Sequence, residues 1–383
     1  MAGHADRAAR ETRLRDALLA WLPSRLAPAG HADFALSDLT APDAGYSGMT
    51  AFFTASWTDE TGGTTSRDLV LRMQSDVHQV FVAPDALRQA EVMRRLGRHP
   101  GVTTPEIVAT EADPSVLGAP FYLMTRVAGR VPSDVPSWHK RGWTTTLSAE
   151  ERARFYDNAL RSLVAVHAID DPDDLAYLRG HSDAAGAADA AGRPGTTALE
   201  RYLDEIVAWH AWCAEDLAVG ADLIREALDL LVAARPDTAA EGVVWGDARV
   251  GNISFADDLT VAALFDWEGA TTGPPDIDVG WWLMFERYLC EALGFTRQPG
   301  TPDDEGILRR YEELGGKLTG DIGYYRLLAA VVLSLITNRL AVLLIRDGLD
   351  EATAHSYPRT AVALVDDYLT AYTTTHQRAS TIR

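Results

Sequence analysis

The sequence is poor in cysteine and in basic residues, and each shortage excludes a class of protein. Its 383 residues include 2 cysteines, Cys213 and Cys290, so we expect no disulfide framework and a protein that acts in the reducing cytoplasm. Lysine and arginine total 35 against 55 acidic residues, which gives a net charge of −20. Nucleic acid and anionic membranes bind basic faces, so we expect neither as a partner. The acidic excess suits a cationic ligand, and it equally suits a plain solvated surface.

Secretory and membrane-spanning segments are not expected either. The N-terminal stretch MAGHADRAARETRLRD is too polar for a secretory signal. The most apolar run, Leu327–Ile345, is interrupted by Thr337, Asn338 and Arg339. A bilayer span of about 20 apolar residues rarely carries an arginine at its middle. The run therefore predicts a buried helix.

Length and composition are those of an enzyme-sized globular protein. Apolar residues make up 47% of the chain and charged residues 23%. A chain of 383 residues exceeds one ordinary core, so we expect two domains or two lobes. No internal repeat is visible.

The first third of the chain alternates short strands with single helices. A leading helix is predicted over 5–22 from its leucine spacing, and a second over 84–98 from an apolar stripe that follows Pro84. Between about 32 and 127 the runs are otherwise β-rich. Segments 49–60 and 66–74 flank the turn signal ETGGTTS and predict a hairpin, and 118–129 predicts a further strand.

The rest of the chain is predicted to be mainly helical, with helices over 149–169 and 198–217 and a flexible insert at 181–195. Short strands interrupt the helices between 243 and 267. We therefore predict an α+β fold of two lobes. Residues 1–127 form a β-rich N-lobe with one main helix, and residues 128–383 form a larger, mainly helical C-lobe.

The candidate functional residues lie in that short β interruption, in VVWGDARVGNISF (243–255) and LFDWEGA (264–270). Alone, the Gly246–Asp247 pair is an ordinary turn. A loop that returns on itself within five residues can aim the Asp247 carboxylate and the Asn252 carbonyl into one cavity. Such oxygen ligands suit Mg²⁺, which also takes waters and substrate phosphates. Asp266 ends an apolar strand, where a metal ion would compensate its buried charge.

Glu268 follows Asp266 by two residues. Strand alternation would place both on one face. A metal or substrate contact and a solvated or structural acid remain equally open for Glu268.

Several motifs in order resemble the aminoglycoside phosphotransferase family, a small-molecule branch of the protein-kinase-like fold. GDARVGN with the downstream FDWE resembles its catalytic and metal motifs. The branch most resembled includes the kinase-like domain of acyl-CoA dehydrogenase family members ten and eleven. Similarity covers most of the chain. The other matching segments are FYLMTRVAGRV (lobe hinge), LVAVHAID (helix end), RPGTTALERYLDEIVAWHAW (helix entry) and GPPDIDVGWW (after the metal strand).

The resemblance implies roles for the residues of the C-lobe. Asp247 would be the catalytic aspartate that orients the acceptor hydroxyl and accepts its proton. Asn252 and Asp266 would hold Mg²⁺ against the nucleotide phosphates, as in other phosphoryl transfer enzymes. Glu268 would assist a second metal or meet the substrate, and Asp278 would support the catalytic loop.

For the N-lobe, the resemblance implies a nucleotide site for ATP or GTP. Kinase-like enzymes grip the phosphates with a strand cation, usually lysine, but the only lysines here are Lys140 and Lys317. Arg72 occupies the matching strand position, with Glu91 as its expected ion-pair partner; an exposed strand arginine is the other interpretation. The nucleotide-binding candidates are Arg72, Glu91, Gly45 and Gly48 of the phosphate-covering loop, and Met124 of the hinge segment.

Trp245 is the main departure from the resemblance, because the family usually has histidine before Gly-Asp. An indole keeps an N–H donor and can brace the loop by packing, but the change can also mark a degenerate site. His167 is expected to be structural, and Trp281 and Trp282 to belong to the core.

Three functions remain open on the sequence. The favoured one is ATP- and Mg²⁺-dependent phosphoryl transfer to a hydroxyl of a small molecule, either aminoglycoside-like or a hydroxylated acid or acyl compound. The second is a nucleotide-binding pseudokinase that regulates a partner, for which Trp245 and Arg72 are the motivation. The third is a metal-dependent phosphohydrolase, which leaves the β-rich N-lobe unexplained. The acceptor and the oligomeric state do not follow from the sequence.

Overall fold

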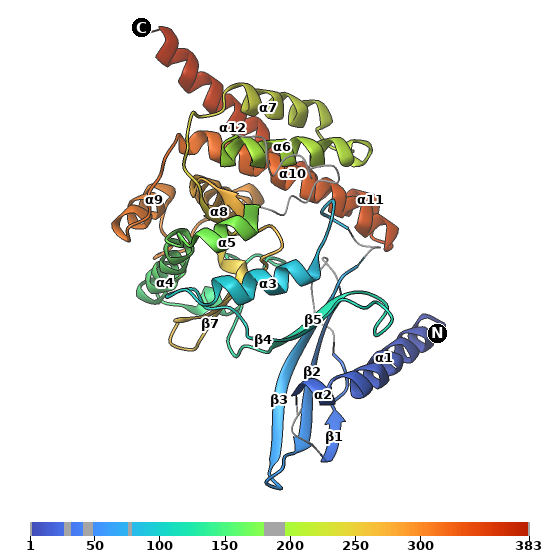
Figure 1. The fold of residues 1–383 in the computed structure, drawn as a ribbon. Helices are drawn as coiled ribbons and strands as arrows, with labels where there is room; N and C mark the ends of the chain where they lie inside the picture. Colours follow the sequence, from blue (N-terminus) through green and yellow to red (C-terminus); the bar gives the residue numbers. More distant parts are fainter. Residues whose placement is uncertain (1, 27–31, 41–48, 76–78, 180–195, 382–383) are drawn as a thin grey trace. The chain divides into compact units, whose positions relative to one another are not determined.

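The computed structural model describes residues 2–26, 32–40, 49–75, 79–179 and 196–381 (Figure 1). The chain divides into two compact units. The first, here called the sheet unit, comprises Met1–Gln79, Pro84–Gly97 and Thr104–Ala128. The second, the helical unit, comprises Val80–Ala83, Arg98–Thr103 and Gly129–Arg383.

The sheet unit is built on five antiparallel strands in the order β1-β2-β3-β5-β4. The predicted hairpin is confirmed: β2 and β3 pair in unbroken register from Met49 opposite Met73 to Thr58 opposite Thr64. The strand bounds are β1 Ala32–Leu36, β2 Met49–Thr58, β3 Thr64–Met73, β4 Ile107–Glu111 and β5 Phe121–Thr125.

One face of this sheet packs on the N-terminal helix. Every second residue of β2 is buried, as strand alternation requires for a sheet with one covered face. The covered face shares a core with Leu14 and Leu18 of α1, Ala2–Trp21, which is followed by the short α2, Pro23–Leu26. Trp21 closes this core, with its ring edge against Phe121 and its indole N–H donated to Glu111.

The main helix of the sheet unit is α3, Ala86–Leu96. It begins one residue after Asp85, whose side chain accepts the backbone N–H of Arg88 as an N-cap. Its buried Gln89 accepts a hydrogen bond of 2.7 Å from the hydroxyl of Tyr122 on β5. The predicted β-rich part with one main helix is therefore confirmed.

The helical unit is a helix bundle in which α10 contacts α7, α8 and α12. The helix bounds are α4 Ala149–His167, α5 Pro172–Arg179, α6 Ala198–Trp212, α7 Ala221–Ala233, α8 Asp276–Leu289, α9 Asp304–Glu313, α10 Ile322–Arg346, α11 Glu351–Ala354 and α12 Ser356–Thr381. Short 3-10 turns occur at Trp143–Thr146, Ala214–Asp216, Val250–Asn252 and Glu291–Leu293. The predicted mainly helical second part is confirmed.

Helix α10 is long and apolar enough to cross a membrane, but 72% of its most apolar window is buried inside the structure, among α7, α8 and α12 (Figure 1). The polar residues that interrupt it have partners. Asn338 accepts the backbone N–H of Val219 at 3.0 Å, and Arg339 pairs with Asp216 at 2.8 Å. The prediction of a buried helix is confirmed.

Two small antiparallel sheets, β6-β9 and β7-β8, form the β interruption of the helical unit. Their strands are β6 Gly242–Val244, β7 Ile253–Phe255, β8 Val261–Leu264 and β9 Thr271–Gly273. The last predicted strand is too long, because β8 ends at Leu264 and Asp266 adopts a left-handed backbone with φ 56°. Strand alternation therefore does not relate Glu268 to Asp266, and that step of the prediction is wrong.

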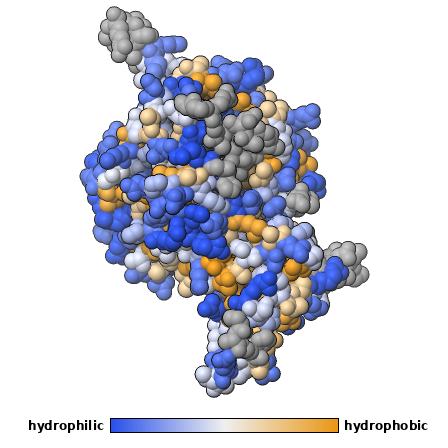
Figure 2. Space-filling view, viewed as in Figure 1, coloured by the Kyte–Doolittle hydropathy of each residue, from blue (hydrophilic) through white to orange (hydrophobic). Residues whose placement is uncertain are grey.

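Hydrophilic residues cover most of the visible face of the helical unit, and hydrophobic residues gather there only in small groups (Figure 2). The large hydrophobic side chains that are exposed in the described residues come from separate parts of the chain: Val131, Val135, Val207, Trp212, Val232, Leu293 and Ile345.

Candidate functional site

The candidate site begins at a tight turn after β6. Gly246 has φ 91°, which disfavours residues with a side chain, and an added Cβ would lie 2.3 Å from the carbonyl oxygen of Gly269. Only glycine fits between β6 and the segment that leads to β9. The turn directs the next residue, Asp247, out of the strand.

Asp247 is held by three side-chain donors. Its Oδ1 accepts the Nε–H of Arg249 and the indole N–H of Trp281, each at 2.8 Å. Its Oδ2 accepts the Nδ2–H of Asn252 at 2.6 Å, and the same amide also bonds the Asp247 carbonyl at 2.9 Å. An ionised carboxylate offers about four acceptor positions, so these bonds fix its orientation and leave capacity on Oδ2.

Arg249 joins Asp247 to a second carboxylate. Its Nη1 lies 2.7 and 2.6 Å from the two oxygens of Asp134, and its guanidinium lies 4.7 Å from the ring centroid of Phe285. Burial disfavours the charge of Arg249, but the carboxylates of Asp247, Asp134 and Asp266 raise its pKa overall. Burial raises the pKa of Asp134, Arg249 opposes this effect and the charge of Asp247 adds to it.

Asp278 supports the turn from behind. Its side chain is fully buried at the start of α8 and accepts the backbone N–H groups of Trp245 at 2.7 Å and Gly246 at 2.9 Å. Its Oδ2 also lies 3.0 Å from Nε2 of His167, whose Nδ1 lies 2.7 Å from the Tyr311 hydroxyl. Burial, followed by the charge of Asp278, raises the pKa of Tyr311, so this hydroxyl stays neutral. His167 and Asp278 therefore have the supporting roles predicted for them.

Trp245 connects the turn to the segment that carries Asp266. Its indole N–H donates to the carbonyl of Phe265 at 2.9 Å, and its ring packs on Trp267 at 5.4 Å between centroids. The backbone N–H of Phe265 in turn donates to the carbonyl of Asn252 at 2.9 Å. These bonds hold Asn252 and Asp266 on adjoining segments, and Trp245 braces the loop by its N–H and its bulk.

The donor set fits a divalent cation. Asp134 and Asp247 both form ion pairs with Arg249, and the charge of Asp266 also raises the pKa of this guanidinium. Asn252 gives its amide N–H to Asp247, which leaves its amide oxygen as the atom for a metal. Amide and carboxylate oxygens with a local excess of negative charge are what Mg²⁺ requires. Glu268 is half-buried in the same segment.

The predicted nucleotide-binding residues lie in the sheet unit. Arg72 on β3 donates from Nη1 to the Thr50 hydroxyl on β2 at 2.9 Å. Glu91 on α3 forms ion pairs with Arg94 and Arg95 of its own helix, and its pairing with Arg72 stays a prediction. Met124 is half-buried on β5. Gly45 and Gly48 lie outside the described residues.

Three residues of the site were not found from the sequence. Arg249 was visible two positions after Asp247, but nothing in the sequence marked its partner Asp134 in a distant loop. Trp281 was assigned to the core, and it is buried, with 5% of its surface exposed. The structure shows that its N–H also reaches Asp247, because α8 starts beside the turn.

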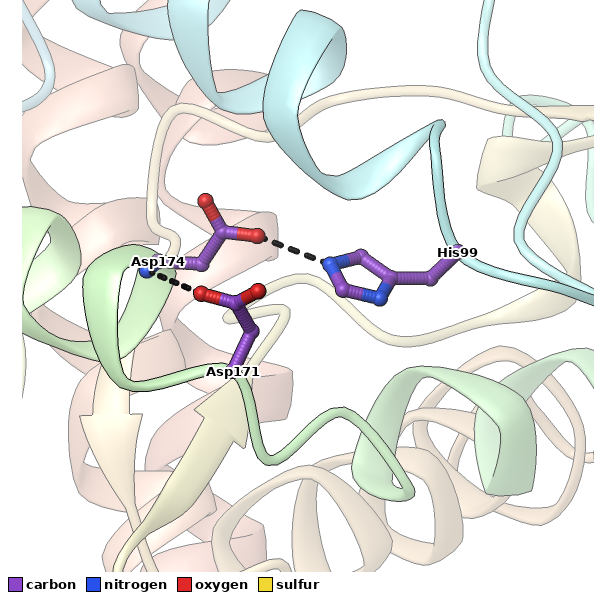
Figure 3. Close-up of side chains that lie close together, drawn as sticks. All are labelled: His99, Asp171 and Asp174. Atoms are coloured by element: carbon purple, nitrogen blue, oxygen red, sulfur yellow. Dashed lines mark hydrogen bonds and ion pairs between the residues drawn. The ribbon is translucent and has the colours of Figure 1, made fainter.

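A second polar cluster, His99, Asp171 and Asp174, lies elsewhere in the helical unit (Figure 3). Its ligand atoms lie within 4.8 Å of one another, close enough for a metal ion. However, the fully buried Asp174 already accepts from Arg98 at 3.0 Å and lies 2.7 Å from Nε2 of His99. Asp171 caps the start of α5 through two backbone N–H groups. The protein itself thus compensates the buried charge, which makes the cluster a structural anchor.

Replacing Asp174 with alanine is expected to lower the free energy of unfolding by about 1–3 kcal/mol, since the partners of a buried acceptor lose their hydrogen bonds. Thermal or urea unfolding measures this loss. The adjacent exposed Asp173 is the matched control, and Asp173→Ala should change stability far less. Equal losses in the two variants would contradict the anchoring role. Zn²⁺ should change the melting temperature of the wild-type protein and of Asp174→Ala by the same amount.

Comparison with known proteins identifies the family of the chain. Residues 38–323 match the profile described as the phosphotransferase enzyme family. Human acyl-CoA dehydrogenase family member 11 is 26% identical over 218 residues, which is 55% of this chain and 25% of that protein. The chain thus spans about a quarter of the length of the curated relatives it matches.

Solved structures share the fold. A Ralstonia eutropha protein, provisionally assigned as an aminoglycoside phosphotransferase, has a TM-score of 0.64 at 22% identity, covering 92% of this chain and 97% of that chain. A thermostable mutant of aminoglycoside phosphotransferase APH(4)-Ia, in a ternary complex with AMP-PNP and hygromycin B, has a TM-score of 0.51 at 17% identity, covering 91% and 98%. The chain therefore belongs to the phosphotransferase enzyme family and has its protein-kinase-like fold.

Proposed function

We propose that this protein transfers the γ-phosphoryl group of ATP or GTP, with Mg²⁺, to a hydroxyl of a small molecule in the cytoplasm. The observation that carries the proposal is the arrangement around Asp247. A carboxylate held by Arg249, Trp281 and Asn252 lies beside the segment of Asp266, in a chain of the phosphotransferase enzyme family.

Asp247 acts on the acceptor in this proposal. Its Oδ1 is occupied by two N–H donors, whereas Oδ2 has one and retains a lone pair. Oδ2 can therefore orient the acceptor hydroxyl and take its proton as the oxygen attacks phosphorus. Positioning of this kind supplies much of the catalysis in phosphoryl transfer.

Asn252 and Asp266 would hold Mg²⁺, and Glu268 would assist a second ion or meet the substrate. Bound Mg²⁺ neutralises charge that develops on the transferred phosphoryl group. The indole N–H of Trp245 bonds the carbonyl of Phe265, the residue before Asp266, and the backbone N–H of Phe265 bonds the carbonyl of Asn252. These bonds keep both proposed ligands in place. Asp278 in turn holds the backbone of the turn before Asp247.

On the nucleotide side, Arg72 would bind phosphate, with Glu91 as its partner, and Met124 and the glycines Gly45 and Gly48 would contact the nucleotide. Arginine binds phosphate through two parallel N–H groups, so it can replace the usual lysine. The complex of APH(4)-Ia with AMP-PNP supports an adenine nucleotide as donor.

Two acceptor classes remain within the proposal. Hygromycin B in the APH(4)-Ia complex supports a cationic aminoglycoside-like acceptor, which the net charge of −20 also suits. Similarity to acyl-CoA dehydrogenase family member 11 supports a hydroxylated acid or acyl acceptor. We expect neither nucleic acid nor a membrane as partner.

A nucleotide-binding pseudokinase is the second candidate, since Trp245 replaces the usual histidine and Arg72 the usual lysine. The contacts of Trp245 favour an active enzyme, because its indole N–H bonds the residue before Asp266 and so keeps the loop braced.

The proposal is tested by incubating the protein with Mg·ATP and a panel of hydroxylated acceptors from both classes. Mass spectrometry should detect the gain of one phosphoryl group on at least one acceptor, and Asp247→Ala should not produce it. Thermal stabilisation by Mg·ATP with no transfer to any acceptor would favour the pseudokinase. No stabilisation and no transfer would refute both.

Replacing Asp266 with alanine is expected to weaken the Mg²⁺-dependent binding of nucleotide by about 10- to 100-fold or more, since a proposed metal ligand is lost. The melting temperature measured with ATP, with and without Mg²⁺, reports this change through mass action. Asp257→Asn, at a fully exposed carboxylate of the same unit, is the matched control and should behave as wild type. An unchanged Mg²⁺ response in Asp266→Ala would remove this residue from the metal site.

A further inference from the structure

Asp134 lies outside every motif of the sequence, yet it contacts the residue that holds Asp247. Both of its oxygens lie within hydrogen-bond distance of Nη1 of Arg249, at 2.7 and 2.6 Å. Arg249 gives its Nε–H to Oδ1 of Asp247 at 2.8 Å. One guanidinium, 12% exposed, thus bridges a loop carboxylate and the proposed catalytic carboxylate.

The guanidinium is also confined from the side. It lies 4.7 Å from the centroid of Phe285, which packs on Trp281 at 5.4 Å, one turn earlier on α8. Trp281 donates to the same Oδ1 of Asp247 that Arg249 contacts. The plane of the guanidinium and the direction of its N–H groups are therefore set by Asp134 and Phe285 together.

Asp134 also sets how the guanidinium of Arg249 is oriented toward Asp247. A guanidinium has five N–H donors in a rigid fork and readily binds one carboxylate through two parallel bonds. The bond from Nη1 to Asp134 fixes how the guanidinium is turned, and in this orientation Asp247 receives the Nε–H on Oδ1, while Oδ2 is left to Asn252 and to a ligand. Without Asp134, the negative groups that still act on Arg249 include Asp247 and Asp266.

We propose that Asp134 is a positioning residue: it holds Arg249 by Nη1, so that Asp247 is oriented through Oδ1 while Oδ2 stays open to the acceptor hydroxyl. This inference rests on the proposed phosphotransfer by Asp247. When Asp134 is lost, Arg249 turns to pair with both oxygens of Asp247, which blocks Oδ2 and shifts the carboxylate.

The test compares Asp134→Asn, Asp134→Ala and Asp134→Glu with the exposed control Asp257→Asn. Misplacement of a catalytic group by about 1 Å can cost ~10²-fold. We expect a kcat about 10-fold lower for Asp134→Asn and about 100-fold lower for Asp134→Ala, with KM for nucleotide little changed and partial rescue in Asp134→Glu. The control should match wild type.

A second readout does not depend on activity. The indole N–H of Trp281 bonds Asp247 directly, so its signal in ¹⁵N-labelled full-length protein, assigned with Trp281→Phe, reports the carboxylate. This signal should move in Asp134→Asn and Asp134→Ala and stay unchanged in Asp257→Asn. If wild type transfers no phosphate, the proposed function fails while the signal still tests the positioning.

Three results would overturn the inference. An unmoved Trp281 signal in both Asp134 variants would show that Asp134 does not orient Asp247. A raised KM for the acceptor with unchanged kcat would make Asp134 an acceptor contact. A loss of kcat that follows a loss of melting temperature, with no movement of the signal, would make it merely structural.

Discussion

Asp247→Ala is expected to lower phosphoryl transfer by about 10²–10⁴-fold, the usual contribution of a positioned general base. The carboxylate proposed to take the acceptor proton is removed, whereas the nucleotide-binding residues proposed in the sheet unit are untouched. Nucleotide binding should therefore remain largely intact. Initial rates with a responsive acceptor, and melting temperature with Mg·ATP, measure the two quantities separately.

The isosteric Asp247→Asn separates the loss of charge from the loss of shape. An amide can still accept from Arg249 and Trp281, but its NH₂ group conflicts with the amide that Asn252 directs at Oδ2. We expect nearly the same loss of transfer with a smaller loss of stability than in Asp247→Ala. Activity equal to wild type in both variants would rule out Asp247 as the catalytic residue.

Asp278→Ala is expected to give the largest loss of stability, about 3–5 kcal/mol. The fully buried carboxylate binds two backbone N–H groups of the turn and lies beside His167, so its removal leaves three polar groups without this acceptor. Calorimetry should show a lower melting temperature by roughly 10 °C. Transfer should fall as well, because the turn that presents Asp247 loses its support.

The matched control is Asp222→Ala on the surface of α7, where the side chain is fully exposed and 3.4 Å from Arg225. It should leave the melting temperature unchanged, because exposed ion pairs contribute little. If Asp278→Ala were as stable as Asp222→Ala, the turn would have to be held mainly by the packing of Trp245 on Trp267.

Local patterns account for the elements that were predicted correctly. Alternating apolar residues and the ETGGTTS turn specify the β2-β3 hairpin, and an apolar stripe after Pro84 specifies α3. The strand into Asp266 was predicted too long because strand propensity continues through Phe265 and Trp267. The left-handed backbone of Asp266 ends the strand, and such a conformation leaves no mark in an apolar pattern.

In the site, too, contacts between residues close in the chain could be predicted, whereas contacts between distant residues could not. Asp247 and Asn252 are five positions apart, so one loop brings them into the 2.6 Å hydrogen bond. Trp281 was assigned to the core because a large aromatic ring is usually buried, and it is buried here. A buried indole N–H also needs a hydrogen-bond partner. Whether that donor meets a backbone carbonyl or the Asp247 carboxylate depends on where α8 lies, and residue type does not show it.

By itself, the sequence determined the α+β class, the shift from strands to helices and the grouping of oxygen-bearing side chains around GDARVGN, because these depend on residues close together in the chain. Only the tertiary structure decided that Asp134 holds Arg249, that Trp281 reaches Asp247 and that Asp278 supports the turn. These contacts join residues that are 32 to 115 positions apart in the chain. Their hydrogen bonds form only when packing of the helices brings the segments within about 3 Å.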